Sequence, residues 1–212
     1  MIKSYDFIYR RLLEYYGPQG WWPADSDFKM MIGSILVQNT NWKNAEKALE
    51  NLKHYLQPEV MHQLAEEKLA HLIRPSGYYN MKAKKIKAFL YWYKKYDYRL
   101  SLLKFREKNE LRKELLNIYG IGNETADVIL LYAMEKPVFI ADNYARRIFR
   151  RLGYNVPHGY DRFREMVERA LPEETSLFNE YHALLVAHGK THCKAAPICE
   201  GCPLLDVCEQ RF

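Results

Sequence analysis

The chain has 212 residues, with 32 lysines and arginines against 26 aspartates and glutamates, and its net charge is +6. Apolar residues make up 48% of it, which is typical of a folded globular protein and excludes a disordered chain. No stretch approaches the roughly 18 consecutive apolar residues of a membrane-spanning helix, and the N-terminus lacks the apolar core of a signal peptide. We therefore expect a cytoplasmic monomer without a membrane partner, associated with the nucleoid if the source is prokaryotic.

Helical periodicity runs through the whole chain. Apolar residues recur at three- and four-residue spacings in residues 5–16, 26–37, 41–55, 59–73, 80–96, 107–118, 123–134, 142–152, 160–170 and 174–188. Glycine or proline lies between many of these segments, as at Gly17, Pro58 and Gly153. No run of alternating strands and no sequence repeat is present, so the pattern predicts an all-α fold.

Positive charge is concentrated in residues 82–114, which hold 12 basic and 4 acidic side chains. Such a local excess favours a polyanionic partner, and nucleic acid is the commonest one. A well-solvated helical face is the alternative interpretation.

Four cysteines lie within sixteen residues near the C-terminus: Cys193, Cys199, Cys202 and Cys208. A reducing cytosol disfavours two disulfides, and four thiolates this close repel one another unless a metal holds them. Structural zinc usually takes two close pairs separated by a longer stretch, whereas here one close pair has an equal arm on each side. The spacing favours an iron–sulfur cluster, with zinc and free structural cysteines as alternatives.

Residues 115–134, LLNIYGIGNETADVILLYAM, predict two helices joined by a tight turn at Gly120 and Gly122. The glycines let the backbone approach another molecule closely, and free N–H groups at the start of the second helix can bind a phosphate. An ordinary helix–helix turn is the alternative. Because no strand precedes the turn, a dinucleotide-binding interpretation fails and a hairpin that binds DNA phosphate is favoured.

Asp142 lies between an apolar run and a helix that carries four arginines. Its position is typical of a helix N-cap. A capping carboxylate beside the positive end of a helix stays ionised, and it can stabilise an oxocarbenium-like centre on a DNA sugar or orient a water. The structural and the catalytic interpretations are compatible.

Taken in order, these features resemble the endonuclease III superfamily of helix-hairpin-helix DNA glycosylases. The resemblance covers most of the chain, through residues 36–40, 77–83, 120–126, Asp142, 188–190 and the cysteine loop. It implies a helix-hairpin-helix DNA glycosylase fold with a six-helix barrel over residues 27–134 and the hairpin at about 112–131. It also implies a cluster domain built from residues 1–26 and 135–212, with a 4Fe-4S cluster on the four cysteines.

The same resemblance implies a base-excision-repair enzyme whose partner is double-stranded DNA containing a damaged base. Asp142 is then the catalytic residue, and Gln38 fills the gap left by the flipped nucleotide, although a polar residue at a helix end is the alternative for Gln38. The DNA-binding residues are Gln38, Gly120, Gly122, Asn123, Thr125 and Lys190. The hairpin carbonyls are also candidates for holding a monovalent cation. We assign His182 and His188 to packing and give neither a catalytic role.

Two positions depart from the family pattern. The first arm of the cysteine loop is one residue shorter than usual, which puts the geometry of the cluster in doubt. Glu124 stands where the bifunctional members have a lysine, whose amine attacks the sugar C1′ and forms a Schiff base that permits strand cleavage. A glutamate cannot do this. The resemblance therefore implies a monofunctional enzyme without efficient AP-lyase activity, in which Asp142 assists and water attacks.

The tryptophans indicate the base. Trp21, Trp22 and Trp42 resemble those of the endonuclease III-like 3-methyladenine glycosylases, and a positively charged alkylpurine stacks well on an indole face. We expect Trp21, Trp22, Trp42 and Glu124 to form the base pocket, with core packing as the alternative for Trp21 and Trp22. A uracil or thymine mismatch glycosylase and a non-catalytic helix-hairpin-helix DNA-binding protein are the competing functions.

Overall fold

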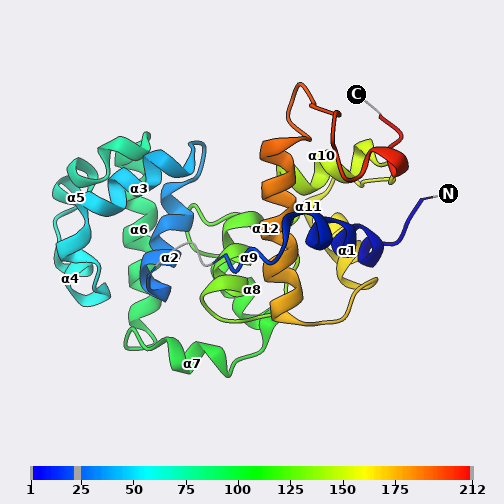
Figure 1. Ribbon diagram of the computed structural model, residues 1–212. Coiled ribbons are helices and arrows are strands. Elements are labelled where there is room, and N and C mark those ends of the chain that lie inside the picture. Colours follow the sequence, from blue (N-terminus) through cyan, green and yellow to red (C-terminus); the bar gives the residue numbers. More distant parts are fainter. Residues whose placement is uncertain (1, 22–24, 211–212) are drawn as a thin grey trace. The chain divides into compact units, whose positions relative to one another are not determined.

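The structure is a computed structural model that describes residues 2–21 and 25–210. Those residues form helices and loops and contain no strand (Figure 1), so the all-α prediction is confirmed. In the described part, no helix has the length and apolar character needed to cross a membrane. The chain divides into two compact units: a central unit, Trp22–Lys136, and a terminal unit made of Met1–Trp21 and Pro137–Phe212.

The central unit is built from eight α-helices and two short 3-10 turns in its described residues. In chain order these are α2 (Asp27–Leu36), α3 (Trp42–Asn51), η1 (Lys53–Tyr55), α4 (Pro58–Gln63), α5 (Glu66–Leu72), η2 (Arg74–Ser76), α6 (Tyr79–Lys94), α7 (Leu100–Lys104), α8 (Lys108–Leu116) and α9 (Asn123–Tyr132). The almost fully buried α2 packs against α3, α6 and α9, so the core of this unit lies around it.

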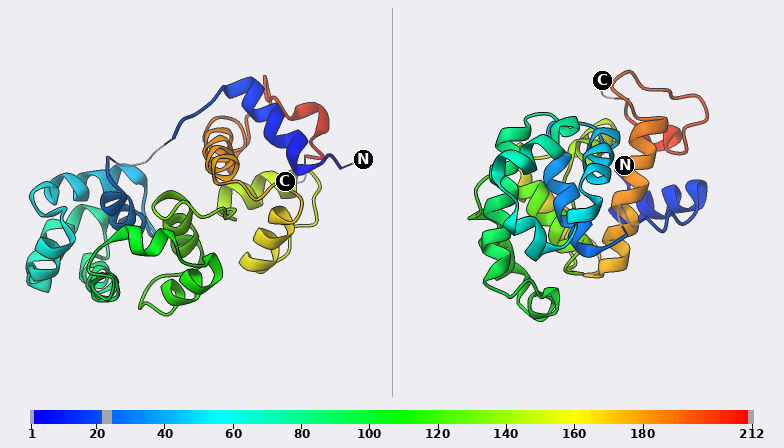
Figure 2. Two further views of the ribbon diagram at one scale, coloured as in Figure 1. Left: turned by 90° about the horizontal axis from the view of Figure 1, so that it is seen from below. Right: turned by 90° about the vertical axis from the view of Figure 1, so that its left-hand side faces the viewer.

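The terminal unit joins the two ends of the chain. It comprises α1 (Tyr5–Tyr16), α10 (Asn143–Arg151), α11 (Tyr160–Glu168), α12 (Thr175–Thr191) and η3 (Leu205–Val207). Figures 1 and 2 show α1 lying beside α12, where Ile8 and Leu12 are buried and the Tyr181 hydroxyl donates to the Tyr5 carbonyl at 2.8 Å. The contact between α1 and α12, which are far apart in the sequence, therefore holds the two segments of this unit together.

Local sequence sets several helix starts. Ser4, Ser26 and Asn41 each precede a helix, and each side chain accepts the backbone N–H three residues later. These N-cap bonds satisfy N–H groups that a helix leaves without internal partners. At the other end of α1, Gly17 takes a φ of 70°, which favours glycine and ends the helix.

Residues 59–73 do not form the single helix that the periodicity predicts. The helix stops at Gln63, and Leu64 and Ala65 are extended before α5 begins. The Lys87 ammonium, from α6, donates to the carbonyls of Met61, His62 and Leu64. A tertiary contact thus satisfies the end of α4, and no glycine or proline marks the break. The short α7 was also absent from the prediction.

The basic segment 82–114 presents less charge than its composition indicates. Lys82 is buried and donates to the carbonyls of Leu36 and Ser76, each at 2.7 Å, and burial lowers the pKa of Lys82 to about 8. The Lys87 ammonium binds the carbonyls at the end of α4, as described above, and the Arg106 guanidinium pairs with the Glu114 carboxylate at 2.6 Å. These cations are bound to groups of the central unit itself, so they add less to an open positive surface than their number indicates.

Candidate functional site

The two hairpin glycines have different surroundings. Gly120 takes a φ of +80°, and a Cβ there would lie 2.3 Å from Lys85 Cγ. Gly122 takes a φ of −94°, and no atom lies within 4 Å of where its Cβ would be. Conformation and the packed lysine therefore require the first glycine, whereas the second leaves open space beside the N-terminus of α9.

Gln38 contacts this hairpin directly. Its amide nitrogen donates to the Gly120 carbonyl at 3.1 Å and to the Thr125 hydroxyl at 2.9 Å, while its Oε1 accepts the Lys85 ammonium at 2.6 Å. The structure thus brings three of the expected DNA-binding residues together, with Lys85 as a member that the sequence did not indicate. The role of Gln38 as a gap filler stays a prediction, as does a monovalent cation at the hairpin.

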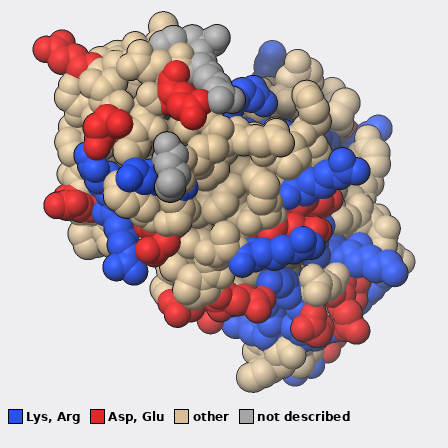
Figure 3. All heavy atoms as spheres, turned by 90° about the vertical axis from the view of Figure 1, so that its right-hand side faces the viewer, with Lys and Arg blue, Asp and Glu red and all other residues tan. Residues whose placement is uncertain are grey.

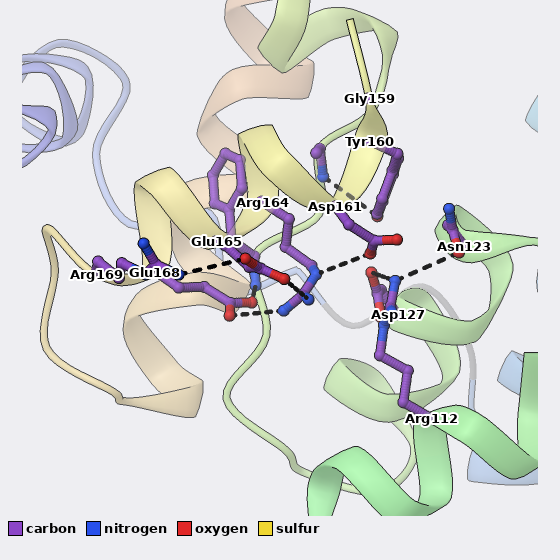
Figure 4. Close-up of polar contacts among 12 residues, drawn as sticks. Arg112, Asn123, Asp127, Gly159, Tyr160, Asp161, Arg164, Glu165, Glu168 and Arg169 are labelled. Carbon is purple, nitrogen blue, oxygen red and sulfur yellow. Dashed lines mark hydrogen bonds and ion pairs between the residues drawn. The ribbon is translucent and has the colours of Figure 1, made fainter. Parts of the chain in front are cut away.

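An ion pair braces the two hairpin helices (Figure 4). Arg112, from α8, donates through Nε to Asp127 Oδ1 at 2.6 Å and through Nη2 to Asn123 Oδ1 at 3.5 Å. The Asp127 side chain is fully buried, and Arg112 is only 11% exposed. The first residue of α9, Asn123, is therefore held against α8 from within the central unit.

Two expected pocket residues lie in the central unit. Glu124 is exposed in the first turn of α9, two residues after Gly122 along the chain. Trp42 begins α3 and is partly buried, with its indole N–H donating to Glu46 at 2.8 Å. Its ring packs on α2, where a Cβ at Gly33 would lie 3.3 Å from Trp42 Cη2.

Asp142 immediately precedes α10 in the terminal unit and is 8% exposed. Its Oδ1 accepts the Ala145 N–H at 2.8 Å, so the predicted N-cap is confirmed. The other oxygen, Oδ2, lies 3.7 Å from Nε2 of His182, which projects from α12. One oxygen of the carboxylate is thus fixed by its own helix and the other faces a buried imidazole.

Trp21 contacts the same histidine of α12 that faces Asp142. Its ring centroid is 5.3 Å from that of His182, with the two planes at 35°. Glu180, one half-turn earlier on α12, accepts the backbone N–H groups of Gln19 at 2.6 Å and Gly20 at 3.3 Å. The structure therefore brings Trp21 and Asp142 to one histidine. The other expected pocket residue of this segment, Trp22, lies outside the described residues.

A basic cavity of about 460 Å³ borders α10 and the end of α12, and Lys190 is one of its lining residues. Lys190 and Lys194 are exposed there, and the Arg147 guanidinium lies over the Tyr144 ring at 5.1 Å. Gly189 permits this packing, because a Cβ there would lie 2.2 Å from Tyr144 Cδ1. The Arg147 guanidinium is bonded to the carbonyls of Cys193 and Gly189, so Lys190 and Lys194 are the cations that suit a phosphate here. Elsewhere the charge is mixed: on the face in Figure 3, lysines and arginines alternate with acidic side chains.

The four cysteines all line one cavity, together with Arg151 and His188. The Arg151 guanidinium donates to Cys193 Sγ at 3.3 Å, the Gln210 N–H donates to Cys208 Sγ at 3.4 Å, and burial raises the pKa of the Cys202 and Cys208 thiols. Among residues 2–21 and 25–210, no three His, Cys, Asp or Glu side chains are grouped closely enough to hold a single metal ion. Four soft sulfur ligands around one cavity, with N–H donors to the sulfur atoms, fit an iron–sulfur cluster.

Residues 32–173 match the family model described as HhH-GPD superfamily base excision DNA repair protein. The chain belongs to this family. It is 43% identical over 206 residues to a provisionally named DNA repair glycosylase of Methanocaldococcus jannaschii, a match that spans 95% of this chain and 94% of the relative. Endonuclease III of Thermotoga maritima is 31% identical over 186 residues, which span 86% and 82% of the two chains.

Among solved structures, this HhH-GPD chain is similar to the 3-methyladenine DNA glycosylase of H. pylori bound to 1,N6-ethenoadenine. The TM-score is 0.76 at 27% identity, with 87% of this chain and 96% of that one covered. The expected resemblance to endonuclease III-like helix-hairpin-helix glycosylases is therefore confirmed. No local motif marks Lys85, Arg112 or His182, because the partners of each lie on another helix or loop: Gln38 for Lys85, Asp127 for Arg112 and Asp142 for His182.

Proposed function

We propose that this HhH-GPD protein is a monofunctional DNA glycosylase that hydrolyses the N-glycosidic bond of alkylated purines, above all 3-methyladenine. The observation that carries the proposal is Asp142, a buried carboxylate held at the start of α10 with one oxygen committed to the cap. Glu124, on the first turn of α9, supplies no amine.

In the proposed reaction, the bond between the sugar C1′ and the purine nitrogen breaks and the base leaves with the electron pair. The Asp142 carboxylate stabilises the positive charge that develops on the sugar, and it accepts a proton from the water that attacks C1′. The products are a free base and an abasic site. Because no amine is joined to C1′, no Schiff base forms and the strand stays intact.

DNA binding is assigned to the hairpin and to the basic cavity. The open space beside Gly122 lets a phosphate reach the N–H groups at the start of α9, and Lys190 and Lys194 offer charge to a second phosphate. Gln38, whose side chain is bonded to Gly120 and Thr125, would support the hairpin or leave it to enter the DNA stack.

The alkylpurine assignment rests on the tryptophans. An alkylated purine is cationic, so an indole face attracts it, and its charge makes it a good leaving group that needs no strong general acid. Trp42 is partly buried with its N–H donating to Glu46, and the Trp21 ring packs on His182 of α12. The similarity to the H. pylori 3-methyladenine glycosylase supports this choice.

Cys193, Cys199, Cys202 and Cys208 would hold a 4Fe-4S cluster, whose role in hydrolysis without electron transfer is structural. Cys193 accepts a bond from Arg151, and Arg151 also donates to the carbonyls of Lys194 and Ala195. The cysteine loop thereby fixes the backbone beside the basic cavity. A brown protein with iron and sulfide in stoichiometric amounts is the expected result, and a colourless preparation with stoichiometric zinc would overturn the assignment.

The decisive assay measures base release and strand cleavage separately. Methylated DNA and duplexes with one defined lesion are incubated with the protein, and each sample is divided into halves with and without alkali. We expect release of 3-methyladenine and strand cleavage only after alkali. Cleavage without alkali would refute the monofunctional assignment, and release of uracil or thymine alone would move the substrate to mismatches.

Asp142→Asn tests the catalytic residue, because asparagine keeps the N-cap. We expect this variant to bind lesion duplexes and to release no base. Asp97→Asn is the matched control, since the Asp97 side chain is 75% exposed in a loop of the central unit. An Asp142→Asn protein as active as the control would reduce Asp142 to a cap and assign catalysis to another group, whereas a wild type that binds lesion duplexes and releases no base would be a non-catalytic DNA-binding protein.

A further inference from the structure

His182 lies in the interior of the terminal unit, on the middle of α12, and is 6% exposed. Two of the side chains around it are those that the proposed function places on the substrate, Asp142 and Trp21. A purely packing role does not require a histidine that contacts both of these side chains. Its neighbours therefore merit a functional explanation.

The contact with Asp142 joins Nε2 of His182 to Oδ2 of the carboxylate at 3.7 Å. Since Oδ1 is fixed by the Ala145 N–H, Oδ2 is the oxygen that remains for the reaction, and the imidazole is the polar group that faces it across the interior. A buried polar group is stable only beside other polar groups. The polar edge of the imidazole gives Oδ2 such a neighbour and limits the directions in which the carboxylate can turn.

The contact with Trp21 uses the other property of the imidazole, its flat ring. A centroid separation of 5.3 Å with planes at 35° lies within the range of favourable aromatic pairs. Glu180 anchors the backbone just before Trp21 through the N–H groups of Gln19 and Gly20. Backbone and ring of this segment are thus both held by α12.

We propose that His182 is a positioning residue that aligns the Asp142 carboxylate through its polar edge and the Trp21 indole through its ring face. The inference rests on the proposed function, because it takes Asp142 as the reacting carboxylate and Trp21 as a wall of the base pocket. It predicts that the two roles can be separated by substitution, since they use different parts of one side chain.

His182→Phe keeps a flat ring for Trp21 and removes the polar edge. We expect the single-turnover rate of base release to fall about 100-fold, the size of effect that a misplaced reacting group produces. Affinity for a duplex with an uncleavable lesion analogue stays at the wild-type value. His182→Gln keeps an N–H within reach of Asp142 and loses the ring. Its rate exceeds that of His182→Phe by about tenfold, since an N–H that can reach the charged group is retained, while its lesion affinity weakens about fivefold.

His71→Phe, on the exposed side of α5, is the control for the substitution itself. Thermal melting of every variant checks that it is folded, and His182→Met replaces His182→Phe in the rate measurement should the latter fail to fold. A wild-type rate for His182→Phe would overturn the proposal. So would losses of rate and affinity that are equal in both variants and follow only the drop in their melting temperatures.

The wild type separates this proposal from the proposed function. A wild type that releases no alkylpurine refutes the substrate, and the contrast between the two variants is then measured on the base that it does release. A wild type that releases no base from any duplex refutes both. An active wild type with an equally active His182→Phe refutes the positioning role alone.

Discussion

Replacing each hairpin glycine by alanine in turn separates what the fold requires from what DNA requires. Gly120 lies at a φ of +80°, where alanine costs about 1–2 kcal/mol. Its Cβ also displaces the Lys85 side chain, which then loses its bond to Gln38, a loss of about 1.5–3 kcal/mol for a charged donor in a protected site and less where water reaches it. We expect the free energy of unfolding to fall by about 2–4 kcal/mol in Gly120→Ala.

Gly122→Ala should change the free energy of unfolding in the opposite direction. Its φ of −94° suits alanine and no atom lies within 4 Å of the added methyl. Restricting the unfolded chain should therefore stabilise the protein by about 0.4–1 kcal/mol. The same methyl occupies the space through which a phosphate would approach α9, so we expect affinity for duplex DNA to fall about tenfold, the value of one lost hydrogen bond to an anion.

Equilibrium unfolding in urea and fluorescence anisotropy with labelled duplex at one fixed salt concentration measure the two quantities, and the salt is fixed because phosphate contacts depend on it. A Gly122→Ala protein as destabilised as Gly120→Ala would contradict the difference between the two glycines. Wild-type DNA affinity in a folded Gly122→Ala would refute the assignment of this space to a phosphate.

Three further substitutions test the described contacts by urea unfolding. Asp142→Ala should lose about 1 kcal/mol with the N-cap, whereas Asp142→Asn should lose almost none. Arg112→Met should lose about 3 kcal/mol, because it removes the guanidinium from the buried Asp127 carboxylate. Burial lowers the pKa of Lys82 to about 8 against about 10.4 in the unfolded chain, so the unfolded chain binds more protons between these values. The wild type should therefore gain free energy of unfolding relative to Lys82→Met as the pH rises through that window. It should lose this gain as the pH falls to the folded pKa of about 8.

Exposed counterparts serve as controls. Arg10 pairs with Asp6 where the side chains are 77% and 42% exposed, so Arg10→Met should change stability by less than about 0.5 kcal/mol. Lys84 is exposed near Lys82 on α6, and Lys84→Met is the matched control for the substitution itself. An Arg112→Met protein as stable as Arg10→Met would contradict the reading of that ion pair, and a flat difference for Lys82→Met would contradict its lowered pKa.

Much of the fold could be predicted because its signals are local. Ser4, Gly17 and Asp142 act through bonds to residues within a few positions, so the sequence near each helix end already contains the cause. The cysteines could be assigned to one site for the same reason, since sixteen residues of chain cannot carry them far apart. They do line one cavity.

Contacts between distant residues were beyond the sequence. The break between α4 and α5 depends on Lys87, more than twenty residues away, and Gln38 is bonded to a hairpin more than eighty residues further along the chain. Lys82 was counted with the basic surface although two backbone carbonyls bind it in the interior. Composition gives the number of such charged groups, but it does not show which of them are bound by partners in the interior.

The pairing of α1 with α12 has a consequence for synthesis on the ribosome. About 160 residues separate the end of α1 from the start of α12, which at about 5–20 residues per second corresponds to roughly 10–30 s of elongation. The central unit is continuous in sequence and can fold during that interval. The apolar face of α1, with Ile8 and Leu12, has no partner from the second part of its own unit until residues beyond Pro137 emerge. In a growing cell, this first helix is therefore the segment most exposed to chaperones and to aggregation.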